Sequence, residues 1–297
     1  MTQKAPEHFT QEIKALFEKS DWSAARLLIK KNLDKGWVGL YGLLAMTHMH
    51  ETDRTEIDCN QALEWLEQGV GAGEPDSLAM LGRVLLSGEL GERDFSRGLS
   101  LLQRAAELGV LMAVLTLLQI HEHGVEEQSE PNPAMAQFYL ERAADLGDPQ
   151  SAYRLAVQLD KSGQDLSRAF RYYDKAAQGG LEQAVHNVGV CYLHGKGVGQ
   201  NTRLAQAYFT EAARLASPLS IISLALLHLD AEFGVKNRSV ALGWVCVYQA
   251  LFPHTEIPDQ LMELISDASG DENLQARSLA QNFLRTQLLK SPQGTVH

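Results

Sequence analysis

Histidine is the residue type best suited to hold a metal ion or to exchange a proton near neutral pH, and this sequence has 10 of them. In two pairs the members lie two positions apart, namely His48 with His50 and His121 with His123. Residues two apart do not share a helix face, so neither pair makes a metal site by itself. His186 and His194 are eight apart and can share a face, but two ligands fall short of a zinc site. We expect no bound metal.

A glycine-rich segment and three cysteines are the other residues that suggest chemistry. Residues 195–199 read GKGVG, which resembles a phosphate loop but lacks both the Lys-Ser or Lys-Thr ending and a preceding strand. Cys59, Cys191 and Cys246 form no CxxC pair and follow no regular spacing. No nucleophile stands in a recognisable arrangement with a histidine and an acid. We therefore expect no catalytic residues and no cofactor.

Most of the histidines, glycines and cysteines discussed above belong to a pattern that recurs along the chain. Its clearest copy runs from Ala184 to Ala216, with small and large residues at helical spacing on both sides of the glycine-rich segment. The last position of the copy occurs seven times, at Gly36, Gly73, Gly109, Gly147, Gly180, Ala216 and Phe252. We call these residues the anchors. They recur every 33 to 38 residues, a period typical of helical-repeat arrays.

Two positions keep a constant distance from the anchors. Eleven residues before each anchor is a small residue: Ala25, Ala62, Gly98, Ala136, Ala169, Ala205 and Ala241. Twelve residues after the first six anchors is a larger one: His48, Leu85, His121, Leu159, Tyr192 and His228. All variation in length falls between the larger residue and the next small one. Close packing resists a change of register inside a helix pair, whereas a loop tolerates insertion. The variable segment is therefore predicted to be the loop within each pair.

This spacing resembles that of the Sel-one-like repeat family, a relative of the tetratricopeptide repeat. The matching residues of the clearest copy are Ala184, Val188-Gly189, Tyr192, Gly195, Gly197-Val198, Ala205, Tyr208 and Ala212-Ala213. The resemblance implies an all-α fold, a right-handed α/α superhelix (solenoid) of about seven helix–turn–helix units with a C-terminal helical cap. It also implies that His48, His121 and His228, at the tyrosine position, are packing residues.

We divide the chain into an N-terminal capping helix pair (1–36), six repeats (37–252), and C-terminal capping helices with a tail (253–297). First helices are predicted near 38–50, 75–87, 111–123, 149–161, 182–194 and 218–230. Second helices are predicted near 60–72, 96–108, 133–146, 167–179, 203–215 and 239–251. The predicted capping helices are 9–19, 22–35, 259–266 and 271–290. Glycine at an anchor is expected to end a helix in the left-handed conformation.

Negative charge is concentrated in the middle of the chain. Residues 51–147 hold 18 acidic residues and 6 arginines, and their net charge of −12 accounts for the −11 of the whole chain. Acidic residues in the loops there include Glu89, Glu92, Glu126, Glu127 and Glu130. Stacked loops would form an acidic edge that attracts a basic protein or peptide. The alternative is that these acids only keep the protein soluble. Nucleic-acid binding is disfavoured, because it needs clustered lysine and arginine.

The concave face, lined by first helices in tetratricopeptide-like arrays, is the second candidate surface. The side chains expected there are Met46, Met49, Met112, His186, Val190, Leu193, Ile222, Leu226 and Leu229. An apolar stripe that faces solvent usually marks a binding site for a partner with an apolar segment. The alternatives are a closed groove, or C-terminal helices that fold back over Leu226 and Leu229.

The resemblance implies a non-enzymatic scaffold or adaptor that recruits a protein or peptide, often in bacterial signalling, envelope or secretion machinery. One alternative is an inhibitor or immunity-type protein that sequesters a single effector. Another is a small-ligand-binding protein or an enzyme with an unrecognised site. The first 20 residues contain no apolar run, and no apolar run is long enough to span a bilayer. We therefore expect a cytoplasmic protein without direct membrane insertion.

Overall fold

The computed structural model describes residues 4–51, 53–125, 128–230 and 236–288. It consists of helices that follow one another in the predicted order. First helices are α3 (Leu40–Met49), α5 (Pro75–Ser87), α7 (Leu111–His123), α9 (Pro149–Ser162), α11 (Glu182–His194) and α13 (Pro218–Leu227). Second helices are α4 (Glu56–Gly71), α6 (Phe95–Glu107), α8 (Pro133–Asp145), α10 (Leu166–Gln178), α12 (Thr202–Arg214) and α14 (Arg238–Leu251). Flanking elements are α1 (Glu7–Glu18), α2 (Trp22–Lys30), the 3-10 helix η1 (Leu33–Lys35), α15 (Asp259–Ser266) and α16 (Gly270–Leu288). The all-α prediction is confirmed.

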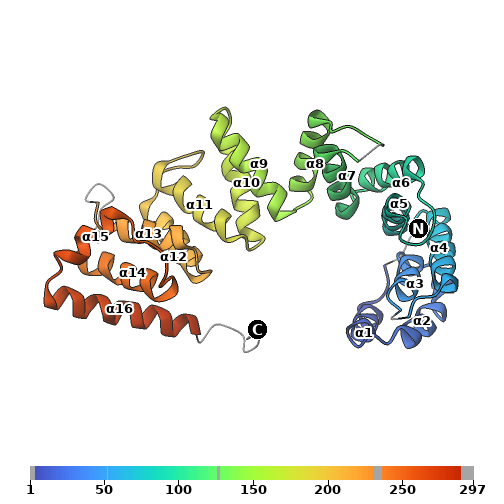
Figure 1. Cartoon of the computed structure of the whole chain (residues 1–297), viewed down its shortest axis with the longest axis horizontal. Coiled ribbons are helices and arrows are strands. Elements are labelled where there is room, and N and C mark those ends of the chain that lie inside the picture. Colours follow the sequence, from blue (N-terminus) through green and yellow to red (C-terminus); the bar gives the residue numbers. More distant parts are fainter. Residues whose placement is uncertain (1–3, 52, 126–127, 231–235, 289–297) are drawn as a thin grey trace. The chain divides into compact units, whose positions relative to one another are not determined.

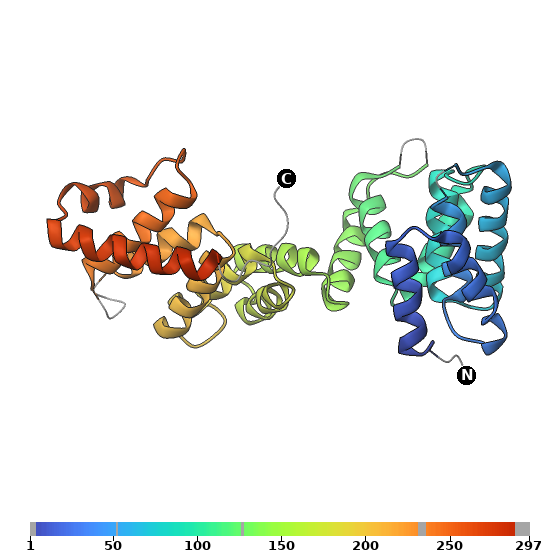
Figure 2. The same cartoon turned by 90° about the horizontal axis from the view of Figure 1, so that it is seen from below.

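The chain forms two compact units, residues 1–146 (unit 1) and residues 147–297 (unit 2). Within unit 1, each helix from α1 (blue) to α8 (green) packs on the next one in chain order, and α3, α5 and α7 also contact one another in succession (Figure 1). Within unit 2 each helix from α9 to α14 packs on the next one in chain order, and α15 and α16 (red) both contact α14, along which α16 lies (Figure 2). Each unit is therefore a stack of helix pairs.

A single polar residue begins most of the second helices. In five of them, and in α2, an Asp or Asn side chain accepts a hydrogen bond of 2.8–3.1 Å from the backbone N–H three residues later: Asp21, Asp94, Asn132, Asp165, Asn201 and Asn237. Each stands fifteen residues before an anchor. Such N-caps satisfy donors that a helix leaves free at its start. The aspartates at this N-cap position thus account for part of the negative charge of the loops, without a role in binding a partner protein.

The α4 helix starts one turn earlier than predicted. Thr55 is its N-cap, and the Thr55 hydroxyl and backbone N–H both donate to the Asp58 carboxylate, which lowers the pKa of Asp58 to about 2. Asp58 occupies the capping position of the other pairs, but here it is the third residue of a capping box. The extra turn therefore depends on Thr55.

The anchors end their helix pairs as predicted, with the backbone in the left-handed region at all five glycines. Ala216 adopts the same conformation, with φ 62°, although its Cβ makes this unfavourable. At Phe252 the chain instead takes φ −129° and leaves the repeat.

Close approach of two helices fixes the register within a pair. A Cβ added at Gly82 of α5 would lie 2.8 Å from the Leu102 Cγ and 2.9 Å from the Gly98 carbonyl oxygen of α6. Both distances are shorter than van der Waals contact, and backbone atoms cannot easily move aside. Glycine at position 82 is therefore required by packing.

We predict that Gly82→Ala lowers the free energy of unfolding by about 1–3 kcal/mol, because the added methyl overpacks the α5–α6 contact. Gly71→Ala is the matched control, since no atom lies within 4 Å of an added Cβ there. The control is expected to be neutral or slightly stabilising. Urea unfolding followed by circular dichroism measures both variants, and equal effects would contradict the packing argument.

Candidate functional site

An apolar groove of about 630 Å³ lies inside unit 1 between α1 and the first helices α3, α5 and α7. One wall is the stripe Phe9, Ile13 and Phe17, whose members follow one another at intervals of four residues along α1. The floor is made by Leu40, Leu43 and Met46 of α3, Met80 of α5 and Met112 of α7. Lys4 and Lys14 lie at one rim, and Asp76 lies on the α5 side. We call this feature the methionine groove.

The position of each floor residue relative to its anchor explains why these side chains meet. Met112 is three residues after an anchor, Leu43 and Met80 are seven after, and Met46 is ten after. Residues separated by three, four or seven positions share one helix face, so these side chains project from the same side of α3, α5 and α7. The corresponding residues of α9 and α11 three and seven positions after the anchor are Gln150, Arg154, Gln183 and Asn187. The apolar groove is thus a property of the residues that unit 1 carries at these positions.

Methionine gives the groove an adaptable surface. Met112 is 47% exposed, Met46 is half-buried, and Met80 is buried at 8% exposure. Unbranched, polarisable side chains of this kind can adjust to different apolar surfaces. The sequence identified Met46 and Met112 but did not identify Met80 or the α1 wall. Met49 is half-buried and is not among the residues that line the groove.

In unit 2 the residues predicted for the concave face pack against other side chains of the same unit. His186 is half-buried, with Nδ1 2.8 Å from the Ser220 hydroxyl and its ring 5.3 Å from the ring of Phe209. Val190, Leu193 and Ile222 pack against the cluster that contains Phe209 and Ala280. Leu226 and Leu229 pack against the cluster built from α13 and α14 together with Leu261, Leu264 and Ala276 of the last two helices. This arrangement is the one expected if the C-terminal helices cover that end of the stripe.

The acidic loop residues form no uniform surface. Glu89 lies 3.3 Å from Arg54 and 3.4 Å from Arg83, and Glu51 pairs with Arg26. Glu92 and Glu130 are exposed. Glu126 and Glu127 lie outside the described residues. Glu89, one of the acids that suggested an attractive edge, is therefore paired with two arginines of the same unit.

The histidines at the tyrosine position are packing residues. His121 stacks on Tyr139 with ring centres 5.5 Å apart, as Tyr192 stacks on Tyr208 at 5.6 Å. His48 is 1% exposed, and its Nδ1 lies 3.2 Å from the Asp58 carboxylate. In the described part of the chain no group of three or more His, Cys, Asp or Glu residues could hold a metal ion. Among the described helices none has the length and apolar character needed to cross a membrane.

Burial makes the contribution of His48 to the stability of the fold depend on pH. It lowers the pKa of His48 below the ordinary 6.5, and this effect outweighs the opposing hydrogen bond with Asp58. Burial also lowers the pKa of His121 and His186. For each of these groups the unfolded chain binds more protons than the folded chain just below pH 6.5. Their contribution to stability is therefore complete above that pH and is lost as the pH falls toward the lowered pKa.

We predict that the free energy of unfolding decreases between about pH 7.5 and about pH 5, and that His48→Leu reduces this decrease. Leucine already occupies the same position as Leu85 and Leu159, so it suits the packing. Urea unfolding at several pH values measures the slope. An identical slope in the variant would show that His48 does not contribute, and His8→Leu, at an exposed position, serves as the control.

Comparison with known proteins finds a curated relative and similar solved structures. Chitin synthase regulatory factor 3 of Schizosaccharomyces pombe is 27% identical over 243 residues, which cover 76% of this chain and 26% of that protein. The chain thus spans about a quarter of the length of this curated relative.

Solved structures share the fold. A protective antigen of uropathogenic Escherichia coli with an SLR fold matches with a TM-score of 0.57 and 20% identity, over 92% of this chain and 61% of that one. A Sel1 repeat protein from Oxalobacter formigenes matches with a TM-score of 0.52 and 20% identity, over 81% of this chain and 98% of that one. An immunity protein from Pseudomonas aeruginosa reaches a TM-score of only 0.35 at 16% identity, over 73% and 86% of the two chains, which is too low to support an argument.

The Sel1 repeat model matches five segments, residues 41–73, 75–110, 112–148, 149–181 and 183–217. The match ends before α13 and α14, which we predicted to be a sixth repeat. Sel1 repeats generally serve as scaffolds for protein–protein interaction and are typically non-enzymatic. Because the five matches cover more than half of the chain, and the fold agrees, this protein belongs to the Sel1 repeat family.

Proposed function

We propose that this protein is a non-enzymatic cytoplasmic adaptor whose methionine groove binds the apolar face of an amphipathic helix from a protein partner. The observation that carries this proposal is an apolar groove of about 630 Å³ with a 47% exposed methionine, Met112, in its floor. Met112 is the exposed part of an otherwise largely buried apolar lining, in which Phe9, Ile13 and Leu40 are at most 4% exposed. An exposed apolar side chain beside an open groove offers a partner an apolar contact. Burial of a helix face in such a groove is a common mode of peptide recognition.

The shape of the groove favours a helical occupant. Along α1, Phe9 and Ile13 are buried in a core cluster with Leu40 and Leu44, and the half-buried Phe17 continues their stripe. Met46, Met80 and Met112 line the groove from the successive first helices α3, α5 and α7. A helix presents its own apolar residues at three- and four-residue intervals, which matches a wall of this kind. The role of Sel1 repeats in protein–protein interaction supports a macromolecular partner over a small molecule.

Charges at the rim favour one orientation of the partner. Lys4, Lys14 and Glu18 line the groove from the N-terminal segment and α1, where two lysines and one glutamate leave a net charge of +1, whereas Asp76 lines it from α5. Lys14 also pairs with Glu18 at 3.9 Å, but both side chains are largely exposed and such pairs are weak. The partner helix is therefore expected to carry acidic residues on the flank that faces α1 and a basic residue on the other flank.

Cysteine usage supports the cytoplasmic part of the proposal. Cys59, Cys191 and Cys246 are free, and burial raises the pKa of the Cys191 thiol to about 11. A buried thiol with a raised pKa is chemically inert, and free cysteines are usual where thiols are kept reduced.

The test is a displayed library of helix-forming peptides of about 15 residues, selected against the whole chain. We expect selected peptides with apolar residues at three- and four-residue intervals and micromolar dissociation constants. Met112→Glu should weaken them about tenfold or more, because a carboxylate would be buried without a partner. Isothermal titration calorimetry gives the constants.

Leu219→Glu is the matched control for this test. Leu219 lies three residues after its anchor, as Met112 does, and it is 62% exposed, but it belongs to α13 of unit 2. Its substitution is expected to leave binding unchanged. Peptides that bind both variants equally, or that lose affinity only with Leu219→Glu, would refute binding in the methionine groove.

A further inference from the structure

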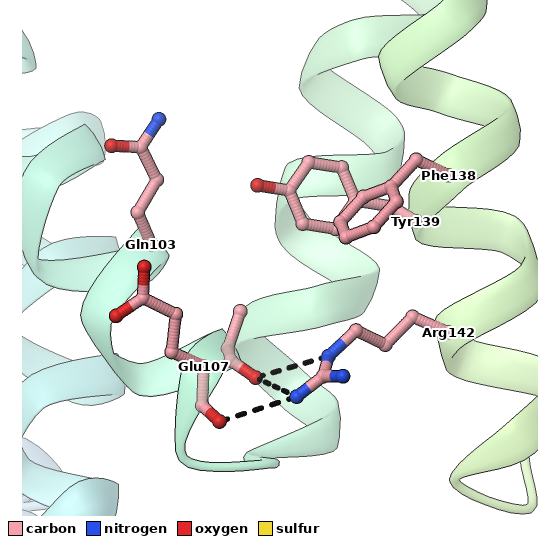
Figure 3. A pocket seen from close by; sticks show the side chains of 6 residues that line it. Gln103, Glu107, Phe138, Tyr139 and Arg142 are labelled. Atoms are coloured by element: carbon pink, nitrogen blue, oxygen red, sulfur yellow. Dashed lines mark hydrogen bonds between the residues drawn. The ribbon is translucent and has the colours of Figure 1, made fainter.

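A second pocket in unit 1, of about 390 Å³, lies between α6 and α8. The α6 side contributes Gln103, Ala106 and Glu107, and the α8 side contributes Phe138, Tyr139 and Arg142 (Figure 3). None of these residues lines the methionine groove. We call this feature the α6–α8 pocket, and its function has to be inferred from its own chemistry.

Arg142 is occupied by the helix on the opposite side of the pocket. Its Nε and Nη2 donate to the Ala106 carbonyl oxygen at 3.3 and 3.1 Å, and Nη2 also donates to the Glu107 carbonyl oxygen at 3.2 Å (Figure 3). These carbonyls lie in the last turn of α6, where the helix supplies no further N–H groups, and the Ala106 carbonyl also accepts from the Gly109 backbone N–H at 3.0 Å. Two of the three guanidinium nitrogens therefore hold the two repeats together at the edge of the pocket.

The other polar groups of the pocket can all accept hydrogen bonds. They are the Glu107 carboxylate, the Tyr139 hydroxyl and the Gln103 amide oxygen. Within the described part of the chain, none of these three side chains makes a hydrogen bond or an ion pair. Burial raises the pKa of Tyr139, and the charge of Glu107 adds to this effect while the charge of Arg142 opposes it. A carboxylate at the C-terminal end of α6 also faces the negative end of the helix dipole.

An exposed aromatic ring completes the pocket. Phe138 is 54% exposed and meets Tyr139 edge to face, with ring centres 5.1 Å apart. Tyr139 is held in place from behind by its stack on His121. The exposed ring of Phe138 is available to the flat or aliphatic part of an incoming side chain.

We propose that the α6–α8 pocket binds an arginine or lysine side chain presented by a protein partner. A cationic group finds a carboxylate, a phenol oxygen and an amide oxygen as acceptors, and an aromatic face for a cation–π contact. An anionic ligand would instead be repelled by Glu107, and three of the five N–H donors of Arg142 are committed to the α6 carbonyls. The guanidinium keeps its positive charge, so the bound cation is expected on the Glu107 side of the pocket, away from Arg142. The net charge of −12 over residues 51–147 attracts a basic partner toward this unit. This site does not depend on the methionine groove.

The test uses a minimal probe, the peptide acetyl-Gly-Arg-Gly-amide, added to the isotope-labelled whole chain and followed by amide chemical shifts. We expect saturable shifts around Glu107 and Tyr139, with a dissociation constant on the order of 1 mM for a single anchored side chain. The citrulline analogue has the same shape without the charge and is expected to bind at least about fivefold more weakly.

Two variants with the same loss of charge separate a specific pocket from general attraction. Glu107→Gln is expected to weaken the arginine peptide at least about fivefold, because it removes the charged acceptor. Glu130→Gln, at an exposed position outside the pocket, should change binding less than about twofold. Phe138→Ala, also at an exposed position, should weaken binding while leaving the melting temperature nearly unchanged.

Three results would overturn the proposal. They are equal weakening by Glu107→Gln and Glu130→Gln, equal binding of the arginine and citrulline peptides, or shifts that cluster away from α6 and α8. The outcome is independent of the methionine groove, because the probe carries no apolar face and neither acidic variant lines that groove.

Discussion

The close contact between the two helices of each pair is the constraint on which the rest of the structure depends. Backbones meet where Gly82 faces Gly98, and in α11 a Cβ at Gly189 would lie 2.7 Å from the Phe209 ring. Contacts this short permit one register. They therefore fix which positions of each first helix, counted from the anchor, lie on the face opposite its second helix. The methionine groove follows from that geometry, since Met46, Met80 and Met112 occupy such positions of α3, α5 and α7.

Much of the fold could be predicted from the sequence because this constraint repeats. The predicted range 75–87 is the observed α5, and the five anchor glycines end their pairs in the left-handed conformation. The early start of α4 was missed because the capping box of Thr55 and Asp58 depends on a local hydrogen bond and not on the repeat. The Asp or Asn fifteen residues before each anchor was visible in the sequence and would have identified the caps.

The candidate site was less predictable, because it combines several helices. Of the residues predicted for the concave face, Met46 and Met112 line the methionine groove, whereas the other seven are not among its lining residues. His186 was expected on the concave face, yet it is hydrogen-bonded to Ser220, and the ring of Phe209 lies 5.3 Å from it. The α1 wall was missed because the N-terminal pair was interpreted only as a cap, although Phe9, Ile13 and Phe17 form a clear helical stripe. Which helix such a stripe will face is decided by tertiary packing, which periodicity alone does not specify.

We propose that unit 1 holds a partner helix between α1 and the floor made by α3, α5 and α7. The most direct measurement is hydrogen–deuterium exchange of the whole chain with and without a helical peptide selected for binding. The account predicts slower exchange in α1 and in the groove-lining turns of α3, α5 and α7, with α9 to α16 unchanged. Protection confined to α11 and α13, with no change in α1, α3, α5 or α7, would contradict it.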